Sequence, residues 1–420
     1  MKKDLRYLVQ NSGLTFVLRI GGMALGYLIA IFISKLYGAD VYGRYSILVT
    51  FSQFTVLLFS LGIPTAIVKL TSESDHFHKI PLTNYLQRSL IVLTGSGLFG
   101  GALIWLTSSL LGYQVFHDNQ LSTLFQYLSY FFLFLIFHNF GTQYLSGKKD
   151  FLSYGLSMFI FPNILFFIIV YLFRSLGLNA EFYVQLSYIL ALSVVGIYLL
   201  LKIPLRKVNK KYAYKNLFKI SLPILFSSMF LFISNWTDIF MLGSMVSKSE
   251  VGIYSAAYKL ATISLIVILT VNIVIAPKIA ELYHKKEQNQ LKAEVRKANQ
   301  LMTILTLPIV AVLLLFRKFF LGLFGLEFLS GETTLILLTI GFLFNAFSGT
   351  ISPILNMTDY QKIFRNLTLA MAVLNIGLNY FLIPQFGIDG AAFASLLSQL
   401  FLNVMAIYYI KKHLGFWALL

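Results

Sequence analysis

Two short segments of the chain are similar in sequence and stand at equivalent positions in its two halves. Residues 40–46 read Asp-Val-Tyr-Gly-Arg-Tyr-Ser before the second long apolar stretch, and residues 250–255 read Glu-Val-Gly-Ile-Tyr-Ser at the start of the eighth. At an offset of 209, identical residues coincide: Gly43 with Gly252, Tyr45 with Tyr254, and Ser46 with Ser255. Each copy contains an even number of apolar stretches, so both copies run in the same direction. This repeat predicts a pseudo-twofold axis along the membrane normal.

The composition places the chain in a membrane. Of its 420 residues 58% are hydrophobic and only 12% are charged, too few to cover the surface of a soluble protein. Twelve spans of about 20 residues each would use about 240 residues. The apolar stretches predict an all-α membrane protein with about 12 transmembrane helices in two six-helix lobes. The expected spans are 13–34, 44–67, 89–111, 122–145, 152–174, 182–201, 219–243, 251–275, 298–316, 333–352, 364–383 and 389–410.

The distribution of positive charge predicts the orientation. If the N-terminus is cytoplasmic, 25 of the 33 Lys and Arg residues fall on the inside, 6 on the outside and 2 within spans. The positive-inside rule then accounts for most of the net charge of +17, so no nucleic-acid partner is expected. Both termini are expected in the cytoplasm, with lobes at 1–205 and 206–420. We expect the basic N-terminus to lead into a retained first span and not into a signal peptide.

The sequence excludes several classes of chemistry. It contains no cysteine, which rules out disulfides, zinc–thiolate sites and cysteine nucleophiles. No glycine loop ending in Gly-Lys-Ser or Gly-Lys-Thr is present, which argues against direct use of ATP. The six histidines form no metal-spaced cluster. We therefore expect no catalytic residue, metal or cofactor, and leave coupling to H⁺ or Na⁺ open.

Three charged residues lie well inside the expected spans and not at their ends, and each is a functional-site hypothesis because a central charge costs about 2.5–3.5 kcal/mol on insertion scales. Arg19 lies roughly 7 Å into the first span and Lys259 roughly 12 Å into the eighth. These two cations suit an anionic substrate. Arg19 can instead extend to the lipid headgroups. Lys259 can instead pair with Asp238 of the seventh span, either as a structural pair or as a switch that a diphosphate or a coupling ion opens.

Two further sets of residues are candidates. One set forms a cytoplasmic collar at the span ends: Lys69, Arg88 and Lys278. The alternative is that these cations only anchor the spans under the positive-inside rule. The other set has side chains that can stack on sugars or hydrogen-bond to them: Tyr45, Asn235, Tyr254 and Tyr258. The alternative is that they form aromatic belts at the membrane interface or pack between helices.

Several segments together resemble a known family. Residues 36–43, Leu-Tyr-Gly-Ala-Asp-Val-Tyr-Gly, are similar to the loop after the first span in polysaccharide flippases of the multidrug/oligosaccharidyl-lipid/polysaccharide exporter superfamily. Residues 221–224, 238–243 and 251–259 resemble the opening of their second half. Residues 374–392 resemble their eleventh-to-twelfth-span hairpin. The resemblance covers most of the chain and rests on the order and spacing of Gly, Pro and aromatic patterns.

The resemblance implies an inverted-V fold of two lobes and export of undecaprenyl-diphosphate-linked repeat units (Wzx-type), as in O-antigen or capsule pathways. The related lipid II flippases carry cations in the first and eighth spans that face the diphosphate. Arg19 and Lys259 stand at similar places. Those flippases usually have arginine where this chain has Lys259, and lysine offers a point charge in place of a planar fork.

We therefore expect a flippase that moves the lipid-linked oligosaccharide from the cytoplasmic to the outer leaflet by alternating access through a cationic cavity. Its expected location is the bacterial inner membrane, and its expected partners are the glycan lipid, membrane lipids and the polysaccharide polymerase machinery. The main alternative is a cation-coupled multidrug antiporter of the same superfamily, which needs more acidic groups in the spans than Asp238. A membrane enzyme and a scaffold without transport activity are further alternatives. Short outside loops argue against the enzyme, and the intramembrane charges argue against the scaffold.

Overall fold

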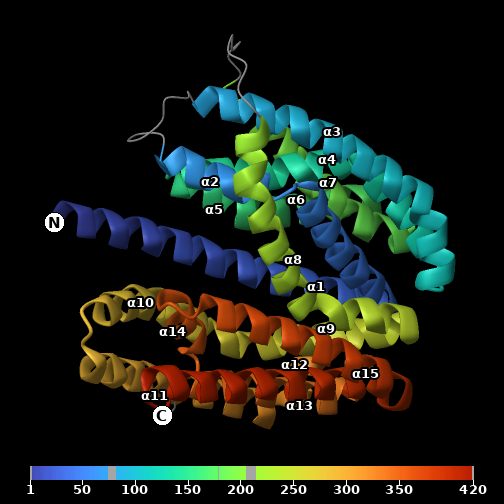
Figure 1. The fold of residues 1–420 in the computed structure, drawn as a ribbon. Coiled ribbons are helices and arrows are strands. Elements are labelled where there is room, and N and C mark those ends of the chain that lie inside the picture. The colour runs from blue at the N-terminus through green and yellow to red at the C-terminus, as the bar shows by residue number, and fades with distance from the viewer. Residues whose placement is uncertain (1, 74–81, 178, 205–213, 419–420) are drawn as a thin grey trace. The chain divides into compact units, whose positions relative to one another are not determined.

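A computed structural model describes residues 2–73, 82–177, 179–204 and 214–418. Every regular element in these ranges is a helix (Figure 1). This confirms the all-α fold class. The first half contains α1 (Lys2–Phe59), α2 (Ile63–Glu73), α3 (Leu82–Ser109), π-helix η1 (Leu110–Val115), α4 (Asn119–Gly147), α5 (Phe151–Gly155), π-helix η2 (Leu156–Ile160), α6 (Phe161–Ser175) and α7 (Ala180–Lys202).

The second half begins with α8 (Tyr214–Met245), α9 (Lys248–Ala261), the 3₁₀ turn η3 (Thr262–Ser264) and α10 (Leu265–His284). It continues with α11 (Gln288–Leu315), α12 (Arg317–Gly322), the 3₁₀ turn η4 (Leu326–Gly331), α13 (Glu332–Phe347), α14 (Ile351–Met357) and α15 (Gln361–Leu414).

Nine helices in the described ranges are long and apolar enough to cross a membrane. Two of these are interrupted by a glycine with non-helical backbone angles, Gly38 (φ 85°) in α1 and Gly387 (φ 56°) in α15, so each consists of two helices that meet at a kink. In addition, α8 contains the shorter apolar helix Leu217–Phe230. The multi-pass membrane architecture is confirmed, and the total of twelve spans stays a prediction.

The structure corrects the ends of two expected spans. The span expected at 44–67 is broken by a turn at Ser60–Gly62, where Leu61 and Gly62 have φ values of 53° and 69°. The span expected at 333–352 is broken between α13, which ends at Phe347, and α14, which begins at Ile351. Each break is only three residues long, at 60–62 and 348–350, and apolar residues flank it on both sides, so a hydropathy window averages over it.

The chain forms two compact units. Unit 1 comprises residues 1–33 and 47–229, and unit 2 comprises residues 34–46 and 230–420. The boundary by contacts therefore lies within α8, and the short segment 34–46 belongs to unit 2 although its neighbours in sequence belong to unit 1. The expected division at 205/206, with six spans in each lobe, stays a prediction.

Small residues set the helix packing in unit 1. Helix α4 packs against both α3 and α7 (Figure 1). A Cβ atom on Gly101 of α3 would overlap the carbonyl of Ser129 on α4, and one on Gly141 of α4 would overlap Leu199 of α7. Such close approach is usual between membrane helices, where the lipid offers no hydrophobic driving force and packing must supply the stability.

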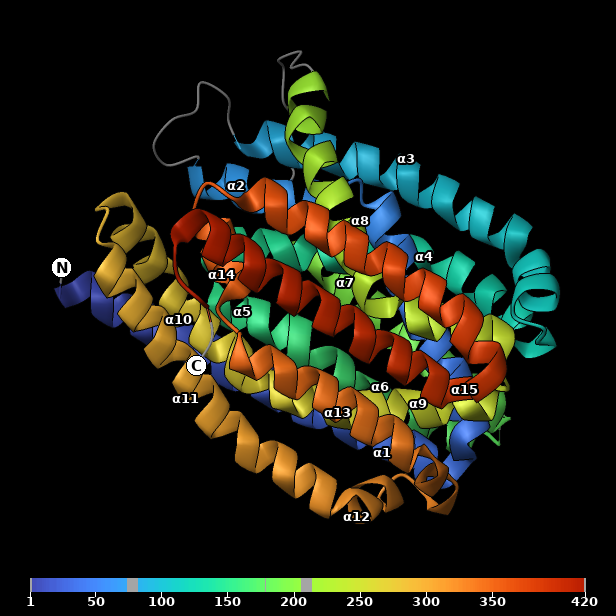
Figure 2. The same ribbon diagram turned by 60° about the horizontal axis from the view of Figure 1, so that its bottom comes forward.

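Unit 2 is organised around α15. Helix α15 packs against α13 and α14, while α10 and α11 form a hairpin (Figure 2). The buried apolar cluster at the α10–α11 end includes Ile279, Leu291, Val295, Ile354 and Ile410. Residues from four helices thus share one core at this end of the unit.

The turn between α1 and α2 yields a prediction about stability. Gly62 has a φ of 69°, and a Cβ there would overlap the carbonyl of Ser221 on α8, within the same unit. We expect Gly62→Ala to destabilise the protein by about 1–3 kcal/mol, through strain and overpacking. Thermal unfolding in detergent measures this as a lower Tm. Gly95→Ala is the matched control, because nothing lies within 4 Å of its Cβ position. Equal melting temperatures for the two variants would refute the prediction.

Candidate functional site

A buried carboxylate organises the polar interior of unit 2. Asp238 of α8 is only 6% exposed. Its Oδ2 accepts hydrogen bonds from the hydroxyls of Tyr254 and Ser395, and its Oδ1 accepts one from Nδ2 of Asn379 at 2.7 Å. A buried charge requires partners of this kind, because an uncompensated carboxylate in a low dielectric is costly.

Local structure explains why these three donors meet. Helix α9 begins with a capping box, in which Ser247 Oγ accepts from the backbone N–H of Glu250 while the Glu250 carboxylate accepts from the backbone N–H of Ser247. This tight connection lays Tyr254 beside Asp238. On α15 the kink at Gly387 folds the chain back, so Asn379, eight residues before it, and Ser395, eight residues after it, reach the same carboxylate.

The amides near Asp238 extend the cluster. Asn379 Nδ2 also donates to Oδ1 of Asn375 at 3.1 Å, and Asn375 Nδ2 lies 3.4 Å from the Ser395 hydroxyl. Oδ1 of Asn379 is buried without a hydrogen-bond partner among the described residues. One carboxylate and several neutral oxygens therefore lie close together, with one oxygen available to a further ligand.

A cavity of about 150 Å³ opens beside this cluster. Its polar lining comprises Asp238, Tyr258, Asn345, Ser395 and Gln399, and its apolar lining includes Leu265, Leu338, Phe342 and Leu396. A polar cavity of this size has room for several water molecules. Asp238 is therefore buried in the protein but borders a space that an ion or water can occupy.

Lys259 stands next to this site on α9. Its side chain is half-buried, and Thr262 Oγ1 donates to the Lys259 carbonyl at 2.6 Å. The helix changes to a 3₁₀ turn at Thr262–Ser264, and such turns inside a long helix often mark hinges. The hydrogen bonds described for Asp238 come from Tyr254, Asn379 and Ser395, and the pair of Asp238 with Lys259 stays a prediction.

Arg19 belongs to unit 1, where its side chain is exposed. The turn of α1 that carries it packs on α5 and η2: Gly22 approaches the backbone of Phe159, and Leu18 approaches Gly155. Asn163 of α6 donates to the carbonyls of Gly22 and Phe159, at 3.3 and 2.7 Å. The small residues near Arg19 therefore serve helix packing, while Arg19 itself is exposed.

The three residues of the predicted cytoplasmic collar lie in different local environments. Lys69 is exposed on α2. The guanidinium of Arg88 lies 4.5 Å from the centre of the Tyr214 ring, a cation–π contact. Lys278 pairs with Glu294 across the α10–α11 hairpin at 3.4 Å. Arg88 and Lys278 thus take part in contacts that anchor helix ends.

The predicted sugar contacts differ in their exposure. Tyr254 is fully buried, and its hydroxyl is taken by Asp238. Tyr258 is half-buried, borders the cavity and packs on Trp236 and Phe342. Tyr45 stacks on Tyr42 at 6.2 Å. Asn235 lies on α8, but its side chain falls outside the described residues. Of the three described tyrosines, only Tyr258 lines the cavity at Asp238.

Sequence reasoning missed Asn375, Asn379 and Ser395. A signal existed, because Asn375 and Asn379 are four residues apart and therefore share one face of an apolar helix. Polar residues inside membrane helices usually face the protein interior. What the sequence could not show is that the Gly387 kink brings this face and Ser395 onto α8.

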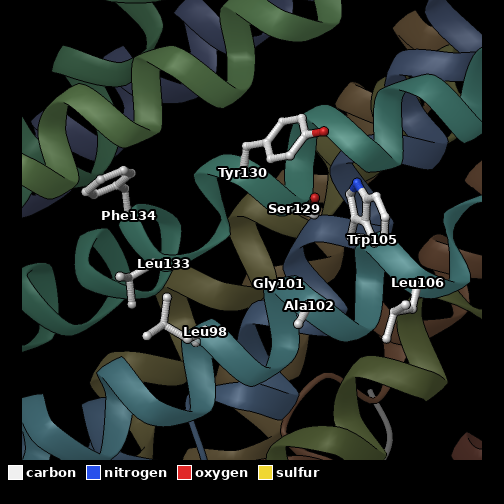
Figure 3. A pocket seen from close by; sticks show the side chains of 10 residues that line it. Leu98, Gly101, Ala102, Trp105, Leu106, Ser129, Tyr130, Leu133 and Phe134 are labelled. Atoms are coloured by element: carbon white, nitrogen blue, oxygen red, sulfur yellow. The ribbon is translucent and has the colours of Figure 1, made fainter.

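Unit 1 carries a shallow apolar groove of about 640 Å³ between α3 and α4. Figure 3 shows Leu98, Trp105 and Leu106 of α3 along one side and Tyr130, Leu133 and Phe134 of α4 along the other. Several lining side chains are widely exposed, with Leu106 at 70% and Tyr130 at 62%. Such a surface is typical of helices that face acyl chains.

Comparison with solved structures identifies the fold. A multidrug transporter of the MOP superfamily in its inward-facing conformation aligns with a TM-score of 0.74 and 14% identity, covering 95% of this chain and 98% of that one. The lipid II flippase MurJ in an inward closed conformation aligns with a TM-score of 0.71 and 17% identity, covering 96% and 87%. The chain therefore has the two-lobe fold of these transporters.

Comparison with curated sequences gives more specific relatives. The probable low-salt glycan biosynthesis flippase Agl15 of Haloferax volcanii is 28% identical over 58% of this chain, and the match spans about half, 52%, of that protein. The probable flippase AglR of the same organism is 23% identical over 96% of this chain and 84% of its own length. The capsular polysaccharide biosynthesis protein CapF of Staphylococcus aureus is 25% identical over 62% and 67%.

Family models match both halves of the chain. The MatE model matches residues 223–381, which include Asp238, Lys259 and Asn379. The model of the polysaccharide biosynthesis protein family matches residues 8–283, which include Arg19 and Lys259. This second match covers well over half of the sequence. The resemblance expected from the sequence is thereby confirmed, and the chain belongs to the polysaccharide biosynthesis protein family.

Proposed function

We propose that this protein is a flippase that moves undecaprenyl-diphosphate-linked oligosaccharide repeat units from the cytoplasmic to the outer leaflet. The observation that carries the proposal is that Arg19 is exposed on a helix apolar enough to cross a membrane. Family membership and curated relatives named as flippases support it. The protein is on this view a transporter and not an enzyme.

Electrostatics favours an anionic headgroup. A diphosphate carries about two negative charges. The low dielectric of the membrane therefore raises a high free-energy barrier to its crossing. Fixed cations beside a wet pathway lower this barrier, while the polyprenyl tail remains in the bilayer. Arg19 receives the diphosphate near the cytoplasmic side and Lys259 holds it deeper. Lys69, Arg88 and Lys278 contribute positive potential at the entrance.

The sugars contact polar and aromatic side chains in this proposal. Tyr258 is the candidate with the best support, because it borders the cavity beside Asp238. Tyr45 and Asn235 remain candidates, whereas the hydroxyl of Tyr254 is already bonded to Asp238. Lysine at 259 gives a point charge without the bidentate geometry of arginine, so the sugars and Arg19 must orient the headgroup.

Asp238 couples transport to a cation in this proposal. The carboxylate, the amide oxygens of Asn375 and Asn379 and the Ser395 hydroxyl form a set of oxygen ligands, and Oδ1 of Asn379 is buried without a partner among the described residues. Hard cations such as Na⁺ prefer such oxygens, and a proton can bind the carboxylate alone. An ion at Asp238 would alter the bonds that hold α8, α9 and α15 together and so bias the conformation.

The proposal places the protein in a bacterial inner membrane with both termini in the cytoplasm, in an O-antigen, capsule or related pathway with polymerase partners. A cation-coupled multidrug antiporter of the same fold would also use Asp238. An exposed arginine on a membrane helix would repel the cationic substrates of such an antiporter. The two functions are therefore separated by the charge of the bound substrate.

The headgroup site can be tested by co-purification. We expect the wild-type protein, purified in mild detergent, to carry polyprenyl-diphosphate glycans that mass spectrometry identifies. Arg19→Ala and Lys259→Met each remove one cation, and we expect about tenfold less bound lipid, because a charge-assisted hydrogen bond contributes about 1.5–3 kcal/mol.

Charge-preserving variants provide the matched controls. Arg19→Lys and Lys259→Arg keep the charge and should retain most of the bound lipid. Equal retention by all variants would place the diphosphate elsewhere, with the entrance cations as the next candidates. If no such lipid is found in cells that make it, the flippase proposal fails and drug export becomes the function to test.

Ion coupling can be tested without a substrate. Trp236 packs on Tyr258, which borders the cavity at Asp238, so its fluorescence should respond to a bound ion. In a Trp105→Phe/Trp417→Phe background we expect a saturable change on adding Na⁺, or on lowering the pH if the ion is a proton. Asp238→Asn should abolish this change. Asp389→Asn, whose carboxylate bonds to Thr334 instead, should preserve it. A response that survives Asp238→Asn would remove Asp238 from the coupling role.

A further inference from the structure

The second arm of α15 carries a stripe of polar side chains. Ser395, Gln399 and Asn403 follow one another at intervals of four residues, so they lie on one face of the helix. Ser395 donates to Asp238, and Gln399 borders the cavity beside that carboxylate. Asn403 is 9% exposed. The stripe therefore begins at the Asp238 cluster and continues along α15 away from the Gly387 kink.

Helix α13, which packs against α15, continues this stripe. Asn345 borders the same cavity, and its Oδ1 accepts a hydrogen bond from Nδ2 of Asn403 at 2.6 Å. The hydroxyl of Ser348 in turn donates to Oδ1 of Asn403 at 3.2 Å. Ser348 is the first residue of the break between α13 and α14. The amide of Asn403 thus connects the cavity at Asp238 to a place where the helix is interrupted.

Two asparagines from neighbouring helices bond to the break. Nδ2 of Asn272 on α10 donates to the carbonyl of Gly349 at 3.0 Å. Oδ1 of Asn299 on α11 accepts from the backbone N–H and the hydroxyl of Thr350, at 3.2 and 2.9 Å. Nδ2 of Asn299 donates to the carbonyl of Ala418, beyond the end of α15. Hydrogen bonds therefore link the break to the end of unit 2 that carries the α10–α11 hairpin.

These side chains form a polar column inside unit 2, whose members are Gln399, Asn345, Asn403, Ser348, Thr350 and Asn299. The part of α15 between Ser395 and Leu414 is about 28 Å long at 1.5 Å per residue. That length is close to the thickness of the hydrocarbon core, which is about 30 Å. The column therefore extends through most of the membrane, from Asp238 to the face that carries Ala418, which the expected orientation makes cytoplasmic.

Both ends of the column offer an oxygen to a further ligand. Oδ1 of Asn379 beside Asp238 and Oδ1 of Asn272 at the break are buried without hydrogen-bond partners among the described residues. Amide oxygens are ligands for hard cations and acceptors for water. Polar side chains within membrane helices often mark ion pathways. Helix packing alone would be served by closed pairs of polar groups and explains neither open acceptor.

We propose that the polar column is the inner route of the coupling cation between Asp238 and the cytoplasm. The cation moves along amide and hydroxyl oxygens within unit 2, and Asn403 is the residue that joins the cavity to the break. A route of its own keeps the cation from pairing with the diphosphate in a low dielectric. The route rests on the coupling role proposed for Asp238, but it can be measured without any glycan lipid.

The route can be tested by how fast an ion reaches Asp238 from each face. Purified protein is reconstituted at low density in the Trp105→Phe/Trp417→Phe background, so that Trp236 reports the ion. A C-terminal affinity tag separates vesicles that expose the face of Ala418 from those that expose the other face. On rapid mixing with Na⁺, or with acid if only a pH step gives a signal, we expect the tag-out vesicles to respond about fivefold faster or more, because the column opens on that face.

Variants of the column should slow this response without weakening the site. Asn403→Leu is similar in size but lacks the amide, and we expect a response about tenfold slower at an unchanged half-saturating concentration. Asn403→Ser keeps a polar group and should recover most of the rate. Ser348→Ala is a milder second variant that should fold normally and slow the response about threefold. Asn356→Leu is the matched control, because its amide bonds to Ser352 outside the column.

Each outcome decides a separate point. Equal rates in wild type, Asn403→Leu and Ser348→Ala overturn the route and leave Asp238 as the coupling site. A faster response from the other face overturns it as well, as does a loss of rate that Asn356→Leu reproduces or that an equal loss of affinity accompanies. A wild type that responds to neither Na⁺ nor acid removes the coupling role of Asp238 and the route with it. Co-purification of the glycan lipid judges the flippase function independently.

Discussion

Inside hydrocarbon, every backbone N–H and C=O must find a partner within the protein, because an unpaired group there costs several kcal/mol. The places where helices stop therefore decide the architecture. The Gly387 kink folds α15 into a hairpin, and the Gly38 kink starts a new helix that Glu327 must cap from 288 residues away. The corresponding helix in the second copy is capped by its own Ser247 and Glu250. One polar requirement is thus met locally in one copy and by tertiary contact in the other.

The same requirement applies to side chains and explains the Asp238 cluster. A carboxylate in this interior needs donors, and hydroxyl and amide donors from α9 and from both arms of α15 supply them. The cluster therefore ties three helices together through a single charge. A cation that binds there would compete with these donors, so a small ligand could change how the helices pack. Its position beside a polar cavity makes that exchange accessible.

The two copies of the repeat meet at equivalent glycines but differ in their charged groups. Gly43 and Gly252 still meet at a reciprocal crossing, as the internal repeat implies. The Asp238 cluster and Lys259, in contrast, belong to unit 2, and the exposed Arg19 belongs to unit 1.

The sequence by itself determined the membrane class, the all-α fold and the family, because composition, apolar span length and repeat spacing are properties of local sequence. It also singled out Arg19, Asp238 and Lys259, since charge is rare in apolar spans. Only the tertiary structure decided which groups surround Asp238, because Asn379 and Ser395 reach it through a backbone kink that hydropathy does not register. The cap from Glu327 was equally hidden, since contacts between distant segments depend on how the helices pack and not on any local pattern.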